Sequence, residues 1–331
     1  MSVMSSFVPI IRADVIAPAL RWMVSHGRDV DSALRAVDLD WYPWDDPHAI
    51  IPVKNAAHFF FNLTQDEGPD IAFHVVAETG VLDIGLLGNA IALCSTPRSA
   101  LTFAASMMPY QCTHEVLVLS KNSDDCVISD SWTFAFKDQE TRHIVAQYVL
   151  ALIHKICRST GKSSPPLQAV RMVPHPEFGL SHLRPWLDCD LQADVNTPLE
   201  VVIPAFIADH SFPKHLVDAG QHLPIPRLRP LRGDGSMAGC LALLAKSMMK
   251  DGNPSLDRMA AIAGVSRRTL QRRLAQEEVS LSDVIDRVRQ DIAAEWLKDP
   301  RSRLQDLSGQ MGYTHPSTLT RAMRRWSEQS P

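Results

Sequence analysis

Residues 254–274 read PSLDRMAAIAGVSRRTLQRRL and decide the fold of the last third of the chain. Apolar residues recur every three or four positions from Leu256 to Ala263, Gly264 follows, and a second amphipathic stretch begins after Ser266. This pattern predicts two short helices that start at serine caps and are joined by a tight turn. The second helix is expected to bury its leucines and expose its basic face. Such an arrangement is a helix-turn-helix, whose second helix fits the major groove of DNA.

The same device returns in residues 304–326, which read LQDLSGQMGYTHPSTLTRAMRRW. Gly312 occupies the turn position of this second copy. With one extra residue allowed near Ser317, Arg321 aligns with Arg272 of the first copy. Two such units in one chain favour a protein that reads a DNA site with one major groove for each unit.

A long helix is predicted between the two copies. Ser280 to Asp283 has the pattern of a capping box, and apolar residues then recur at spacings of three and four as far as Trp296. Asp299-Pro300 is expected to end the helix. About nineteen residues at ~1.5 Å each make a rod of ~28 Å, which holds two reading heads roughly one turn of duplex apart.

Length and composition are those of an ordinary globular protein. A chain of 331 residues accommodates two or three domains. No run approaches the ~18 apolar residues that a membrane span needs, and the N-terminus lacks the pattern of a secretory signal. The six cysteines are scattered among apolar neighbours without a C-x-x-C pair. These features predict a cytoplasmic protein with reduced, mostly buried thiols and no membrane contact.

Charge is distributed unevenly along the chain. Residues 236–331 hold 15 Lys and Arg against 11 Asp and Glu, whereas residues 1–235 hold 18 against 26. A basic module beside an acidic one fits a DNA-binding domain joined to a domain that does not bind DNA. Between them, the stretch before Met237 is rich in proline and glycine, which disfavour helix. We therefore predict a first domain at 1–222, a linker at 223–236 and a second domain at 237–331.

The first domain mixes helical and strand-like patterns. Helices are predicted over the ranges Ala13–Val37, Val53–Leu63, Ile71–Ala77, Pro97–Met108 and Gln139–Cys157. Strands are predicted over the ranges Glu115–Leu119, Cys126–Phe136 and Leu199–Phe206. The predicted fold is therefore an α+β domain followed by an all-α domain of two helix-turn-helix units joined by a long helix.

From Met237 to Pro331 the chain resembles the DNA-binding domain of AraC/XylS-type transcriptional regulators. The resemblance rests on the strings RRTLQRRL and TLTRAMRRW and on the apolar linking helix between them. It implies a bacterial, cytoplasmic regulator of transcription that inserts two recognition helices into successive major grooves of its operator DNA and contacts RNA polymerase.

The first domain resembles the effector domain of the ornithine-utilisation regulator and related family members. The resemblance rests on DIGLLGNA at residues 83–90, CSTPRSAL at residues 94–101 and the long helix from Gln139. It implies a domain that senses a small molecule and forms a homodimer. The many predicted helices argue against the small β-barrel that binds arabinose in the family's namesake.

The family resemblance also implies which side chains contact DNA. The expected base-reading residues are Arg268, Gln271 and Arg272 in the first unit, and Ser317, Thr320 and Arg321 in the second. Arginine forks match guanine and glutamine suits adenine. The expected phosphate contacts are Arg267, Arg273, Arg324 and Arg325. A solvated surface position is the alternative for any single arginine, but their grouping on the two helices favours DNA contact.

No motif for catalysis or metal binding is found. The chain has no H-E-x-x-H, no zinc-type Cys/His spacing, no P-loop and no G-x-S-x-G, so we predict no enzyme activity, no metal and no cofactor. Trp132, Phe134 and Phe136 alternate along a predicted strand and are candidates for an effector pocket. The same alternation is also typical of core residues.

Three functional hypotheses remain open. The first is a transcriptional activator whose first domain binds an unknown small-molecule effector. The second is a regulator without a small effector, controlled by its abundance or by a protein partner. The third is a DNA-alkyl-repair enzyme with an AraC-type head, which needs a cysteine with an activating neighbour; Cys112-Thr113-His114 comes nearest.

Overall fold

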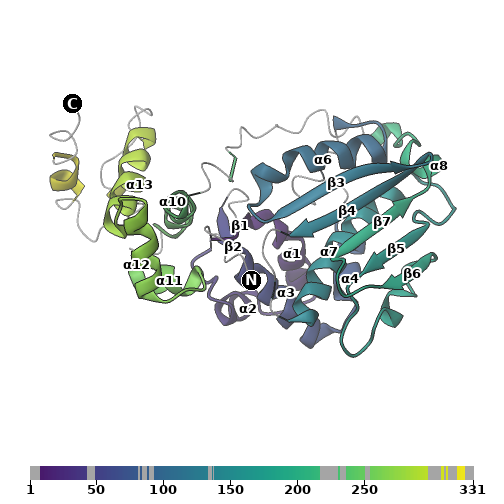
Figure 1. Ribbon diagram of the computed structural model, residues 1–331, viewed down its shortest axis with the longest axis horizontal. Helices are drawn as coiled ribbons and strands as arrows, with labels where there is room; N and C mark the ends of the chain where they lie inside the picture. The colour runs from purple at the N-terminus through teal and green to yellow at the C-terminus, as the bar shows by residue number, and fades with distance from the viewer. Residues whose placement is uncertain are drawn as a thin grey trace.

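The computed structural model describes residues 8–42, 49–80, 83, 88, 93–132, 136, 138–216, 230–231, 236–249, 254–296, 307–308, 311 and 319–324. The first part of the chain forms a mixed α+β domain. The described residues that follow it form a helical domain (Figure 1). The predicted combination of an α+β domain and an all-α domain is therefore confirmed.

A five-stranded sheet organises the first domain. Its strands, in spatial order, are β3 (Glu115–Asn122), β4 (Asp125–Trp132), β7 (Leu199–Ile203), β5 (Ala169–Met172) and β6 (Asp190–Ala193). Neighbouring strands are antiparallel except β5 and β6, which are parallel. A separate two-stranded sheet pairs β1 (Ile10–Arg12) with β2 (Ile50–Pro52).

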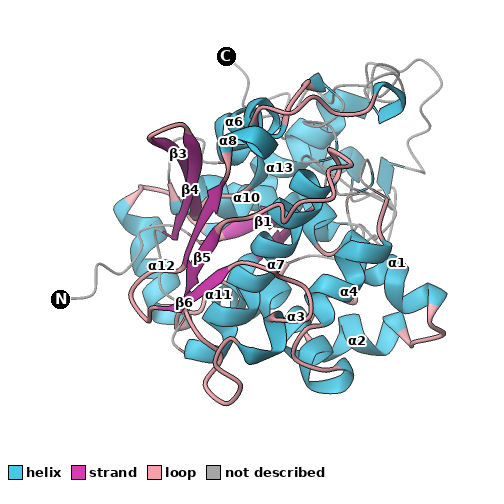
Figure 2. Cartoon of the chain, turned by 90° about the vertical axis from the view of Figure 1, so that its right-hand side faces the viewer, coloured by secondary structure: helices cyan, strands magenta, loops and turns pink. Residues whose placement is uncertain are grey.

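The described helices of this domain lie mainly to one side of the large sheet (Figure 2). They are α1 (Ala17–Ser25), α2 (Val30–Ala36), α3 (Val53–Glu67), α4 (Ile71–Glu78), α6 (Pro97–Gln111), α7 (Gln139–Arg158) and the short α8 (Ala205–Ala208). The described part of this domain also contains the 3-10 turns η1 (Ala13–Val15) and η3 (Ser181–Leu183). The long α7 buries its apolar side against α3 and α4, as its spacing predicts.

Several predicted elements have different bounds in the structure. The predicted helix Ala13–Val37 is wrong as a single element, because Gly27 has a φ of +67° and turns the chain between α1 and α2. The strand predicted to reach Phe136 is described as far as Trp132, and residues 133–135 lie outside the described residues. The strand predicted to reach Phe206 ends before Pro204, and α8 follows.

The second domain consists of α10 (Met237–Met248), α11 (Leu256–Ile262), α12 (Arg267–Gln276) and α13 (Leu281–Trp296), followed by a helical stretch at 319–324. The linking helix α13 is described to Trp296, and its predicted end at Asp299-Pro300 lies outside the described residues. Leu307, Met311 and Leu319 are buried against Ala293 of α13. Across the described residues, none of the helices is long and apolar enough to cross a membrane.

Candidate nucleic-acid interface and effector cavity

The first helix-turn-helix unit has the capping that its sequence predicts. The Ser255 hydroxyl accepts a hydrogen bond from the backbone N–H of Arg258 at the start of α11, at 3.2 Å. The Ser266 hydroxyl accepts one from the N–H of Thr269 at the start of α12, also at 3.2 Å. Between the helices Gly264 has a φ of +64°, the left-handed region that glycine adopts without strain. These contacts set the angle at which α12 leaves the turn.

Helix α12 separates a buried face from an exposed one. Leu270 and Leu274 are buried in the domain core. The exposed face carries Arg267, Arg268, Gln271 and Arg272, and Arg273 is half-buried at its border. The structure therefore brings the expected base-reading residues of the first unit together on one face. This face has the size and chemistry of a major-groove reading helix.

The second unit is described in part. Leu319 and Ala322 are buried, while Thr320, Arg321 and Arg324 are exposed. The succession of one buried leucine followed by two exposed polar residues repeats that of Leu270 to Arg272. Two other residues predicted to contact DNA, Ser317 and Arg325, lie outside the described residues.

Helix α10 packs beside the first helix-turn-helix unit. The carboxylate of Glu277, which follows α12, accepts hydrogen bonds from the backbone N–H groups of Met237 and Ala238 at 2.8 and 2.9 Å. This carboxylate satisfies two of the four N–H groups that a helix start leaves unpaired. Lys246 of α10 pairs with Glu295 of α13 at 3.0 Å. No sequence pattern marked Met237–Met248 as a separate helix.

The two domains are in direct contact through α10 and α11. The backbone N–H of Ile50 in β2 donates to the Ser247 hydroxyl of α10 at 2.9 Å. Arg258 of α11 pairs with Asp38 at 3.2 Å and with Asp40 at 3.6 Å. The first helix-turn-helix unit and the neighbouring helix α10 therefore contact the first domain at two separate points.

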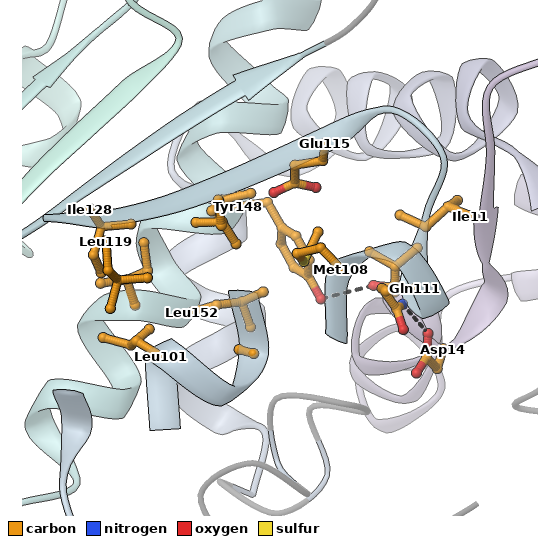
Figure 3. Close-up of a pocket in the computed structure, with 15 residues that line it drawn as sticks. Ile11, Asp14, Leu101, Met108, Gln111, Glu115, Leu119, Ile128, Tyr148 and Leu152 are labelled. Atoms are coloured by element: carbon orange, nitrogen blue, oxygen red, sulfur yellow. Dashed lines mark hydrogen bonds between the residues drawn. The ribbon is translucent and has the colours of Figure 1, made fainter. Parts of the chain in front are cut away.

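A cavity of about 90 Å³ lies between the large sheet and helices α6 and α7 (Figure 3). Its walls come from β1, η1, α6, β3, β4 and α7, and most of its lining is apolar. Tyr148 of α7 donates its hydroxyl proton to the carbonyl of Val15 at 2.8 Å, and Gln111 donates its Nε2 proton to the carboxylate of Asp14 at 2.6 Å. Mostly apolar cavities with a few convergent polar groups are typical of small-molecule sites.

Of the three aromatic residues predicted for an effector pocket, Trp132 and Phe136 do not belong to the lining of this cavity. Trp132 is half-buried; its indole N–H donates to the carboxylate of Asp130 at 3.0 Å, and its ring packs edge-on against Phe136. Phe136 lines a surface hollow that faces Gly264 of the second domain. Phe134 lies outside the described residues. The alternation of aromatic residues indicated a strand that contributes to the cavity. The cavity-lining residues Gln111 and Tyr148 lie on helices, and no sequence pattern marked them as site residues.

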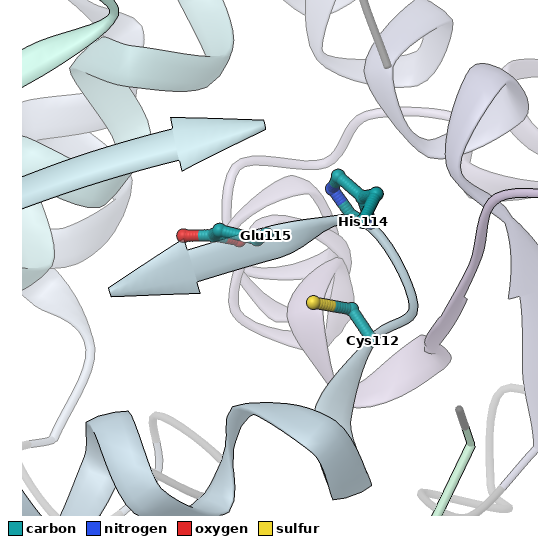
Figure 4. Close-up of side chains that lie close together, drawn as sticks. All are labelled: Cys112, His114 and Glu115. Carbon is teal, nitrogen blue, oxygen red and sulfur yellow. The ribbon is translucent and has the colours of Figure 1, made fainter. Parts of the chain in front are cut away.

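Burial and a neighbouring carboxylate perturb Asp130, which lies on the strand β4. Burial, followed by the charge of Glu115, raises the pKa of Asp130 well above its usual range. A second buried cluster places Cys112, His114 and Glu115 with one ligand atom each within 4.8 Å of one another (Figure 4). Thiol, imidazole and carboxylate are ligands that zinc accepts, and the sequence search for standard spacings missed this group.

Four cysteines have thiol pKa values that are shifted away from those of a reactive thiolate. Burial raises the pKa of the thiols of Cys94, Cys126 and Cys157, and burial raises that of Cys189 to about 11. A nucleophilic cysteine requires the opposite shift. These four thiols therefore do not provide the chemistry of a DNA-alkyl-repair enzyme.

Comparison with known proteins gives matches along most of the chain. Residues 259–331 match the model of a helix-turn-helix domain, and residues 27–197 match that of the arabinose-binding N-terminal domain of AraC transcription regulators. An uncharacterised HTH-type transcriptional regulator of Mycobacterium tuberculosis, Rv1395, is 24% identical over 353 residues, covering 97% of this chain and 95% of the relative. The HTH-type transcriptional regulator VirS of Mycobacterium tuberculosis is 34% identical over 101 residues, 30% of each chain.

Among solved structures, the transcriptional regulator CdpR from Pseudomonas aeruginosa is 18% identical, with a TM-score of 0.41, and the match covers 94% of this chain and 96% of that one. The two mycobacterial relatives are both described as HTH-type transcriptional regulators.

Proposed function

Because the chain belongs to the AraC family of transcriptional regulators, as the family models at 27–197 and 259–331 show, we propose that it activates transcription in response to a small molecule. It is a DNA-binding regulator and not an enzyme. The proposal adds that residues 1–222 bind the effector and form a homodimer, that 223–236 act as a linker, and that the bound regulator recruits RNA polymerase in the bacterial cytoplasm. The family resemblance supports these additions.

DNA recognition is assigned to the exposed faces of the two units. In the first unit Arg268, Gln271 and Arg272 project from the same side of α12, while Leu270 anchors the helix from the opposite side. The proposed base contacts of the second unit are Ser317, Thr320 and Arg321. The proposed phosphate contacts are Arg267, Arg273, Arg324 and Arg325, which add affinity without sequence choice.

One observation carries the proposal of effector control: the cavity and the DNA-binding domain contact the two strands of the same small sheet. Ile11 of β1 lines the cavity and pairs with Ile51 of β2. The residue before Ile51 in β2, Ile50, donates its backbone N–H to the hydroxyl of Ser247 in α10. A ligand that shifts β1 therefore changes the support of α10, and with it the position of the first reading head.

Measurement of DNA occupancy across the genome tests the regulator. The tagged protein should give sharp peaks, and the double variant Arg272→Ala/Arg321→Ala should lose them. Each substitution is expected to cost about 1–3 kcal/mol of binding free energy and to relax base choice. Arg184→Ala, which removes an exposed arginine from the first domain, is the matched control and should retain the peaks. Unchanged peaks in the double variant would contradict the proposed docking.

Control by abundance or by a protein partner is the competing mechanism. In that case no small molecule stabilises the protein. A bound effector raises the unfolding temperature of the full chain by mass action, whereas a regulator without an effector shows no such shift with any metabolite of a broad panel.

A further inference from the structure

The cavity of the first domain has its polar groups at one end. Figure 3 shows Asp14, Gln111 and Glu115 together at that end. The opposite end is formed by the apolar side chains of Leu101, Leu119, Ile128 and Leu152. A sugar carries hydroxyl groups around its whole ring, and each hydroxyl buried without a partner is costly. The lining therefore fits a ligand with one polar head and an apolar body better than it fits a pentose.

The polar end presents acceptors. Gln111 uses its Nε2 to donate to Asp14, and its Oε1 is buried without a hydrogen-bond partner. Tyr148 donates its hydroxyl proton to the carbonyl of Val15, so its oxygen can act only as an acceptor for a ligand. The residues described as lining the cavity include two carboxylates, Asp14 and Glu115, and no lysine or arginine. A head that donates hydrogen bonds is complementary to this set of acceptors, whereas a carboxylate head has no hydrogen to donate to it.

The size of the cavity limits the ligand. A volume of about 90 Å³ holds roughly six to nine water-sized groups, at about 10–15 Å³ for each. This corresponds to a short aliphatic or cyclic molecule with its head group. Longer ligands need movement of Met108 or another wall residue.

We propose that this cavity binds a small apolar molecule with one hydrogen-bond-donating head, an alcohol or an amine. The head lies at Gln111 Oε1 and the body lies between Leu101, Leu119 and Leu152. This inference rests on the proposed function, in that the ligand is the effector of the regulator. It predicts that the domain does not take arabinose, although the matching family model is described as arabinose-binding.

Calorimetric titration and thermal unfolding of the full chain test the ligand class with four probes: hexan-1-ol, hexylamine, hexanoate and L-arabinose. The alcohol and the amine should bind and raise the unfolding temperature, and the other two should not. Comparison of the alcohol with the amine shows whether the head is neutral or cationic. Gln111→Leu keeps a similar volume but removes the acceptor, and should weaken binding of both by about 3–10-fold.

Ala104→Phe, which fills the cavity from α6, should abolish binding of both probes. Ser106→Phe on the exposed side of the same helix is its matched control and should bind both normally. The inference is overturned if L-arabinose or hexanoate binds as well as the alcohol and amine, if none of the four binds, or if Ala104→Phe retains binding. Operator binding by the same protein preparations is measured in parallel, so an error in the ligand class is distinguished from failure of the DNA-binding function.

Discussion

Leu270 and Gln271 are neighbours on α12, and their substitution should have opposite effects on stability and on DNA binding. The Leu270 side chain is fully buried, with 0% of its surface exposed. Leu270→Ala removes its apolar contacts and leaves a cavity, which costs about 2–5 kcal/mol in a packed core. For a helical domain of this size, each kcal/mol lowers the unfolding temperature by about 4–8 °C. The second domain of the variant should therefore unfold at least ~8 °C lower.

Gln271→Ala should behave in the opposite way. Its side chain is exposed, and a surface substitution changes the unfolding free energy by about ±0.5 kcal/mol or less. Loss of a base contact should instead weaken operator binding by about 1–3 kcal/mol, or roughly 5–150-fold. Calorimetry measures the unfolding of both variants, and fluorescence anisotropy with labelled operator measures their affinity. Two results would refute the orientation of α12: a strong destabilisation by Gln271→Ala, or an unchanged unfolding temperature for Leu270→Ala.

Three further predictions concern single side chains. Arg258→Ala removes a partly exposed ion pair with Asp38 worth about 0.2–1 kcal/mol, so amide exchange in α11 should accelerate by at most about fivefold; complete loss of protection would show a larger role for the pair. Burial lowers the pKa of His143 from 6.5 to about 3, so the unfolded chain takes up a proton first as the pH falls. His143 should contribute about 2 kcal/mol to the drop in unfolding free energy between pH 7 and pH 5, so the drop should be smaller by that amount in His143→Gln, and an equal drop would exclude this cause. Burial and the charge of Glu115 raise the pKa of Asp130, so native stability is lost as the pH rises above ~3.8. Asp130→Asn should therefore stabilise the protein more at pH 7 than at pH 4, as measured by urea unfolding, and the reverse order would contradict this reasoning.

The second domain shows where local sequence is sufficient. Ser255, Gly264 and Ser266 act through contacts within four residues, so their roles as caps and turn could be predicted without the tertiary structure. Leucine spacing likewise predicted the buried face of α12. Local interactions of this kind depend on chain geometry alone.

The candidate effector cavity shows where local sequence is insufficient. Its walls join Ile11, Gln111 and Tyr148, which are separated by up to 137 positions in the chain. None of these residues belongs to a periodic or chemical motif that marks a site. The aromatic alternation through Trp132 identified a strand of the sheet, but packing placed that side chain beside Phe136 instead of in the cavity lining.

The sequence by itself determined the caps and the turn of the first helix-turn-helix unit and the exposed face of α12, because spacing along a helix decides which face each residue occupies. Only the tertiary structure decided that Ile50 contacts α10, that Arg258 reaches Asp38, and that a cavity lies behind β1. These contacts depend on how whole elements pack against one another. Packing is set by the combined shape of many side chains, which no local pattern encodes.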